Sequence, residues 1–143
     1  MTSPDTPAPV ISASSYVLGF DNVEVTFSEL IGIQSEIDAA TASTTTPPHP
    51  FGTASPPTLT LTRGADGNTG IWAWHTAALE GNPAARKNCT LKLQGASGQT
   101  LLTFVLENAW PTTVTIAGLQ SGASQLVLET DVFVCDAITM QPG

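Results

Sequence analysis

Short runs in which apolar and polar residues alternate, each ended by turn residues, recur along this 143-residue chain. Residues 58–63 read TLTLTR, with Leu59 and Leu61 facing one way and threonines the other, and residues 89–94 read CTLKLQ with the same period of two. Such alternation places the apolar side chains on one face of a strand. The chain is therefore predicted to be mainly antiparallel β, with strands buried on one side.

The other predicted strands are separated by turn chemistry. Asp21-Asn22 favours a hairpin turn, Gly32 a kink, and the NAWP sequence at 108–111 a break. The remaining predicted strands cover residues 16–20, 23–27, 28–38, 100–107, 112–117 and 125–135, with turns at 95–98 and 118–124. Leu126, Leu128, Val132 and Val134 are expected on the buried side of the last strand, and Glu129 and Asp131 on its wet side.

One segment, residues 69–80, is predicted to be a helix. Asn68 or Thr69 can cap its start, Gly81 suits its end and Pro83 prevents its continuation. At helical spacing Trp74 lies roughly 200° around the axis from Trp72. The apolar face is expected to consist of Ile71, Trp72, His75, Ala78 and Leu79.

Two segments show no pattern of a packed core. Residues 1–15 are rich in Pro, Ser, Thr and Ala and are predicted to be a flexible arm. Residues 39–57 form an uncharged stretch with five prolines, predicted to be an extended loop that is either disordered or ordered by a partner. Residues 16–143 are expected to form a single domain.

Charge and cysteine usage exclude several function classes. The formal net charge is −8, and the chain's only four cations are Arg63, Arg86, Lys87 and Lys92, so a basic nucleic-acid footprint is absent. The opening MTSPDTPAPV lacks the features of a secretory leader, and no apolar run reaches membrane-spanning length. We therefore expect cytoplasmic synthesis, reduced thiols at Cys89 and Cys135 and no membrane anchor.

No arrangement of reactive side chains points to catalysis or to a cofactor. His49 and His75 do not share metal-site spacing with the two cysteines, so no metal is expected. No nucleophile motif occurs, and Glu129 and Asp131 form only an isolated carboxylate pair on one strand. Trp72, Trp74 and Trp110 could stack on sugars, but the helical spacing keeps Trp72 and Trp74 from forming one platform. Packing is the preferred interpretation for these three side chains.

The order of the motifs along the chain resembles the tail tube proteins of contractile phages and of phage-tail-like extracellular contractile injection systems. The resemblance covers about residues 16–134, and Arg63, Gly64, Trp72, Trp74, Trp110 and Pro111 belong to the motifs that carry it. These motifs are TLTLTRG at 58–64, IWAWH at 71–75, RKNCTLKL at 86–93, NAWP at 108–111 and LVLETDVFV at 126–134. The segment 39–57 is longer than the corresponding family loop, and residues 136–143 match no motif.

The resemblance implies an antiparallel β-barrel or sandwich with one flanking helix, and hexameric rings that stack into the inner tube of a contractile sheath. The implied partners are further copies of the chain, the sheath protein, baseplate or spike-hub proteins, tube-terminating proteins, and an effector protein or DNA as passing cargo. Thr44, Pro47, Pro48 and Phe51 would contact neighbouring subunits, and Glu129 and Asp131 would face the lumen. Edge-to-edge joining in a ring would also cover the open sheet edges.

Three alternatives remain open at this stage. The short, alanine- and threonine-rich form favours an injection-system tube over the DNA conduit of a phage. A small carbohydrate-binding β-sandwich is the second alternative, based on aromatic and Thr/Ser-rich strands. A hydrolase using Glu129 and Asp131 is the third.

Overall fold

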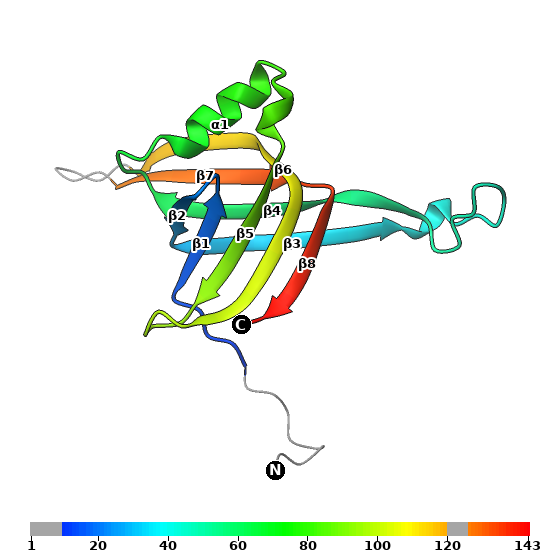
Figure 1. Cartoon of the computed structure of the whole chain (residues 1–143), viewed down its shortest axis with the longest axis horizontal. Coiled ribbons are helices and arrows are strands. Elements are labelled where there is room, and N and C mark those ends of the chain that lie inside the picture. Colours follow the sequence, from blue (N-terminus) through cyan, green and yellow to red (C-terminus); the bar gives the residue numbers. More distant parts are fainter. Residues whose placement is uncertain (1–9, 120–125) are drawn as a thin grey trace, which may run out of the picture.

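The computed structural model describes residues 10–119 and 126–143. Most of the predicted arm 1–15 and most of the predicted turn 118–124 therefore lie outside the described residues. The described part confirms a mainly β fold with antiparallel strand pairs and one α-helix (Figure 1). Its strands are β1 (Ser15–Phe20), β2 (Val23–Phe27), β3 (Glu29–Asp38), β4 (Thr53–Gly64), β5 (Lys87–Gln94), β6 (Thr100–Leu119), β7 (Leu126–Val134) and β8 (Ala137–Pro142).

The strands form two layers that share the long strand β6. The first sheet has the order β2-β1-β5-β6-β8 and uses residues 100–109 of β6. The second sheet has the order β6-β7-β4-β3 and uses residues 110–119 of β6. Figure 1 shows the strands of the second sheet crossing behind those of the first.

The predicted break at 108–111 is wrong, because β6 continues through it and passes from one sheet to the other. Asn108 has a positive φ of 51°, and the pairing register with β7 shifts between Pro111 and Thr113. A bulge of this kind bends a strand without ending it. The prediction also missed β8, which pairs with β6 and covers most of the unmatched segment 136–143.

The core lies between the two sheets. The predicted inward residues of β4 and β5 are confirmed, since Leu59, Leu61 and Leu91 are inaccessible to solvent. Phe27 of β2 and Phe133 of β7 are equally buried. Each such side chain stabilises the fold by about 1.5–3 kcal/mol relative to its exposed state.

Helix α1 (Gly70–Leu79) closes one end of this core. Its predicted boundaries hold: Asn68 Oδ1 accepts a hydrogen bond from the Gly70 N–H, and Gly81 adopts a positive φ of 75°. The expected apolar face is partly wrong, because Trp74 is buried whereas Trp72 is 51% and Leu79 is 73% exposed.

Trp74 can be buried because its indole N–H has a hydrogen-bond acceptor. The ring lies 4.6 Å from that of Phe20 and 5.5 Å from that of Phe133, and Nε1 donates to the Ala85 carbonyl in the short 3₁₀ turn η2 (Pro83–Ala85). An indole with a satisfied N–H can be buried without an unpaired donor. Ile71 and Trp74, three residues apart, therefore form the inward face of α1.

The extended loop predicted for 39–57 is shorter than expected. A 3₁₀ turn, η1 (Ala39–Thr41), follows β3, a bridge joins Ser43 to His49, and β4 already begins at Thr53. Pro56 and Pro57 consequently lie within β4, near a register irregularity in its pairing with β3. Figure 1 shows the β3–β4 hairpin projecting far beyond the body of the domain.

Candidate functional site

The second sheet presents a hydroxyl-rich face on the side away from the core, which we call the threonine face. Its central residues pair across strands: Thr62 lies opposite Thr130, and Thr130 lies opposite Thr115. The Thr62 and Thr130 hydroxyl oxygens are 3.1 Å apart. By the same alternation, the face formed by β4, β6 and β7 consists of Thr58, Thr60, Thr62, Thr113, Thr115, Ala117, Leu128, Thr130, Val132 and Val134. It carries no charged residue in the described part of these three strands.

The prediction that Glu129 and Asp131 lie on a wet face is wrong. Both side chains point into the core beside Phe133, and Glu129 is 5% and Asp131 0% exposed. The alternation was misread because the aliphatic face of β7 points away from the core, whereas the two carboxylates share the inward face with Phe133. Neither carboxylate is available to a lumen or to a substrate in this subunit.

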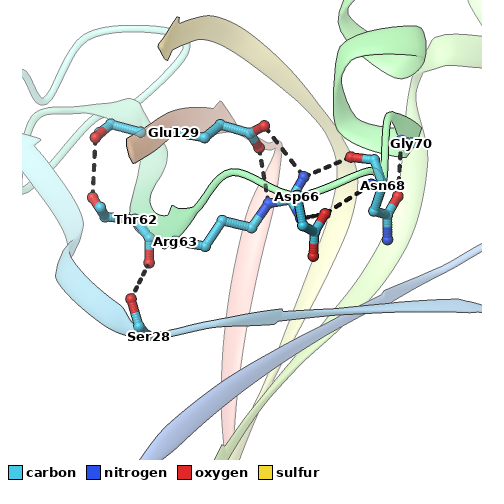
Figure 2. A network of polar contacts seen from close by, with 8 residues as sticks. Ser28, Thr62, Arg63, Asp66, Asn68, Gly70 and Glu129 are labelled. Carbon is cyan, nitrogen blue, oxygen red and sulfur yellow. Dashed lines mark hydrogen bonds and ion pairs between the residues drawn. The ribbon is translucent and has the colours of Figure 1, made fainter. Parts of the chain in front are cut away.

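A buried cation pairs with Glu129 (Figure 2). Arg63 of β4 donates from Nε to Glu129 Oε2 at 3.1 Å and from Nη2 to Oε1 at 3.2 Å. It also reaches Asp66 Oδ1 at 3.0 Å and the Asn68 carbonyl at 2.8 Å, and it lies 5.9 Å from the ring centre of Phe27. Two hydrogen bonds between a guanidinium and a carboxylate fix the relative orientation of the two groups and strengthen the ion pair.

This network ties β4, β7 and the turn before α1 together. Asp66 accepts a hydrogen bond from the Asn68 N–H, and this bond, followed by Arg63, lowers the pKa of Asp66. Asn68 in turn accepts a hydrogen bond from the Gly70 N–H at the start of α1. The Arg63-Gly64 motif is therefore the anchor that positions the helix, with Gly64 at the exposed end of β4.

Asp131 lies close to this network without sharing in it. Both carboxylate oxygens are buried and have no hydrogen-bond partner within the described structure. Burial, and then the Glu129 carboxylate, raises the pKa of Asp131 to about 8, although Arg63 acts in the opposite direction. The side chain is therefore mainly protonated at pH 7.

The remaining predicted packing residues divide between core and surface. Pro111 is buried, and its carbonyl oxygen lies 2.9 Å from His75 Nδ1, which holds α1 against β6. Trp110 is half-buried beside the end of α1, and Trp72 is on the surface. Since Trp74 is in the core, the three tryptophans form no aromatic platform for a sugar.

The described residues contain no group of three His, Cys, Asp or Glu side chains that could hold a metal ion. Cys89 and Cys135 are free and buried, and burial is the first cause that raises their pKa values, to about 12 and about 11. Among the described residues there is no helix long and apolar enough to cross a membrane.

The predicted inter-subunit residues lie at the end of the projecting hairpin. Thr44, Pro47 and Pro48 are exposed, and Phe51 has 75% of its surface accessible. A large aromatic side chain with this exposure on a protruding hairpin marks a surface that a partner can cover.

Chains in solved structures of contractile injection systems and of Hcp proteins share this two-layer antiparallel β fold. PVC is an extracellular contractile injection system, and a chain from the structure of its sheath/tube terminator has a TM-score of 0.71 at 19% identity. The match covers 97% of this chain and 99% of that one. A chain from the PVC sheath-tube complex has a TM-score of 0.68 at 19% identity, covering all of both chains. Hcp1 from Flavobacterium johnsoniae has a TM-score of 0.61 at 15% identity, covering 90% and 96%.

The family model described as T4-like virus tail tube protein gp19 matches residues 12–139, and the chain belongs to this family. No curated protein sequence matches it closely enough to count as a relative. The predicted resemblance and fold class are thus confirmed. The family is one of structural tube proteins, and the chain is a tail tube subunit.

Proposed function

We propose that this chain forms the inner tube of a contractile injection system as hexameric rings stacked inside a sheath. The proposal rests on the match of the tail tube family model to residues 12–139. It is supported by the similarity in fold, over the full length, to a chain of the PVC sheath-tube complex. The DNA conduit of a contractile-tailed phage is the second candidate, because the same family model is named for a phage tube.

The second sheet is suited to ring formation because both of its outer strands have a free edge in the subunit. β3 pairs only with β4, and residues 110–119 of β6 pair only with β7 among the described strands. Exposed edges invite pairing with another chain. A head-to-tail ring of identical subunits would cover all of these edges at once.

The same arrangement supports a lumen lined by the threonine face. The first sheet and α1 lie on the core side of the second sheet, so the subunit is bulkier on that side. Wedge-shaped subunits close into a ring most easily with the broad side outward. The lumen wall would then be hydroxylated and nearly uncharged, in place of the acidic wall predicted from Glu129 and Asp131.

The β3–β4 hairpin is proposed to join successive rings. It extends along the direction of the second sheet's strands, which in a ring built from this sheet run mainly along the tube (Figure 1). Thr44, Pro47, Pro48 and Phe51 would therefore contact the next ring. The same proposal includes assembly in the bacterial cytoplasm and contact with the sheath, the baseplate or spike hub, and the terminator. It also includes passage of an effector protein through the tube.

Electron microscopy of the purified chain, alone and with its baseplate proteins, tests the proposal. We expect annular rings and hollow tubes, and a chain that stays monomeric with every nucleating partner would contradict a tube function. Protein rather than DNA in the lumen of native particles would favour the injection system over the phage tube.

Replacing residues 42–52 by a short glycine turn tests the role of the hairpin. The variant should form single rings but no tubes, because only the contact between rings is removed. The variant Met140→Ala, which alters an exposed apolar residue on β8, serves as a control and should still form tubes. Tubes of normal length from the shortened chain would reject the assignment.

A further inference from the structure

The inward face of β7 carries two buried carboxylates, but a single cation lies beside them. Glu129 and Asp131 are two residues apart on this face, and Arg63, opposite Glu129 on β4, donates two hydrogen bonds to Glu129. Asp131 lies opposite Leu61 of β4 and Val114 of β6, and both of its oxygens lack a hydrogen-bond partner in the described part of the chain. One of the two carboxylates therefore has no compensating cation.

The other three side-chain cations are engaged elsewhere. They are Arg86 beside Asp136, Lys87 beside Asp21, and Lys92 on the face of β5 that points away from the core. An ionised carboxylate without a partner is strongly disfavoured inside a protein. The excess negative charge beside Glu129 is therefore removed most simply by a proton.

Asp131 is the group that holds this proton. Burial, followed by the Glu129 carboxylate, raises the pKa of Asp131 to about 8, whereas Arg63 acts in the opposite direction. The ion pair with Arg63 uses the carboxylate form of Glu129. The pair of acids thus holds one proton at pH 7 and releases it in mildly alkaline solution.

The other ionisable side chains on the elements around Asp131 are directed to other partners or to solvent. They are Asp66, bound on the outer side of Arg63, His75, in contact with the Pro111 carbonyl, and Glu24, exposed on β2. Residues 110–119 of β6 contribute none. The thiols of Cys89 and Cys135 lie in the same core, and burial is the first cause that raises their pKa values, to about 12 and about 11. Asp131 is therefore the acid whose ionisation adds charge to this core near neutral pH.

Arg63 divides its donors between the core and the turn that leads into α1 (Figure 2). Nη1 donates to Asp66 Oδ1 at 3.0 Å, and Nη2 donates to the Asn68 carbonyl at 2.8 Å. The Asp66 side chain is 65% exposed, and the Asn68 carbonyl is uncharged. Contacts with an exposed carboxylate and with a neutral carbonyl are weaker than an ion pair with a buried carboxylate. A newly ionised acid in the core would therefore take Arg63 from the turn.

We propose that ionised Asp131 competes with this turn for Arg63, so that loss of the Asp131 proton draws the guanidinium inward and releases the start of α1. Arg63 and Asp131 are diagonal neighbours on one face of the β4–β7 pair, because Arg63 lies opposite Glu129 and Leu61 opposite Asp131. Diagonal residues of an antiparallel pair are roughly 7–8 Å apart, within reach of a long side chain. This switch belongs to the subunit itself and does not depend on ring formation.

Release of the turn is favoured as pH rises. Asp131 binds its proton more tightly with the turn in place than beside an inward-turned Arg63, so the released state binds fewer protons. The equilibrium then shifts toward release by up to about tenfold per pH unit until about pH 8. Between pH 6 and pH 8, release should become at least about tenfold more favourable.

Hydrogen exchange of the full chain at pH 6 and pH 8 measures the release, with labelling times corrected for the pH dependence of exchange from unfolded amides. The amides of Asn68, Gly70 and Ala73 mark the turn and the start of α1, because each donates a hydrogen bond there. Their protection should fall at least about tenfold from pH 6 to pH 8. This exchange should be nearly independent of low urea concentrations, because local release exposes little surface, whereas exchange by global unfolding accelerates with urea.

Variants that cannot ionise at position 131 identify the titrating group. Asp131→Asn should keep the same protection of the turn at both pH values, and Asp131→Leu is a second such variant in case an unpaired amide disturbs the core. Glu24→Gln removes an exposed carboxylate of β2 and should behave like the parent chain.

Three results would overturn the switch. The first is equal protection of the turn amides at pH 6 and pH 8 in the parent chain, and the second is their exchange only through a urea-sensitive opening. The third is a loss of protection with pH in Asp131→Asn and Asp131→Leu that equals the loss in the parent chain. Each of these results leaves the proposed tube function standing.

Discussion

Replacing Asp131 with Asn should stabilise the subunit, and the gain should grow with pH. Asp131 is fully buried, and neither of its oxygens has a hydrogen-bond partner within the described structure. Its pKa is raised to about 8, above the roughly 3.9 expected for an unfolded chain. Asn has nearly the same shape and never ionises.

The direction in which stability changes with pH follows from proton linkage. A raised folded-state pKa means that the folded protein binds the Asp131 proton more tightly than the unfolded chain does. The associated stability is fully present below about pH 4 and is lost progressively as pH rises to about 8. The pKa difference sets a ceiling of about 5 kcal/mol, and local relaxation should reduce the observed loss to about 2–4 kcal/mol.

Urea unfolding of monomeric protein at pH 4, 6 and 8 provides the measurement. The free energy of unfolding of Asp131→Asn should match that of the parent chain near pH 4 and exceed it by about 2–4 kcal/mol at pH 8. Glu24→Gln, which neutralises an exposed carboxylate on β2, is the control and should show no such trend. An Asp131→Asn effect that is independent of pH would refute a buried, protonated Asp131.

Three further predictions concern the same domain. Arg63→Met should destabilise the subunit by about 3–5 kcal/mol in urea unfolding, because it leaves the buried Glu129 without its cation, and Arg63→Met with Glu129→Leu should recover much of that loss. Trp74→Ala should lower the free energy of unfolding by about 3–5 kcal/mol, whereas Trp72→Ala should cost under about 1 kcal/mol in the monomer. Thr60→Lys should permit tube formation but retain acidic cargo or added DNA in tubes examined by microscopy, and unaltered passage would place the threonine face outside the lumen.

Strands with a strict contrast between their two faces were predictable from sequence. β4 and β5 alternate leucine or cysteine with threonine or charged residues, and their inward residues were identified correctly. The Asp21-Asn22 turn was equally clear, because both residues adopt the positive φ that a two-residue hairpin requires. In each case the local chemistry admits one arrangement.

The errors arose where two arrangements satisfy the local pattern. In β7 the sequence LVLETDVFV offers an aliphatic side and a side with Glu129, Asp131 and Phe133, and only the guanidinium of Arg63, 66 residues away, makes burial of the acidic side favourable. In α1 either tryptophan could have faced the core. Phe20 and Phe133, both distant in sequence, and the Ala85 carbonyl in the turn after the helix favour burial of Trp74.

The misassigned carboxylates change the physical account of the conduit. Were Glu129 and Asp131 exposed to the lumen of the proposed hexameric ring, they would place negative charge on its wall and select cargo by charge. The structure instead keeps Glu129 neutralised by Arg63 and Asp131 mainly protonated inside the subunit, while the face of β4, β6 and β7 opposite the core presents hydroxyls and aliphatic groups. A wall of this kind exerts little force on a passing molecule of either charge. Glu129 instead holds Arg63, which binds the Asn68 carbonyl and so positions the turn that leads into α1.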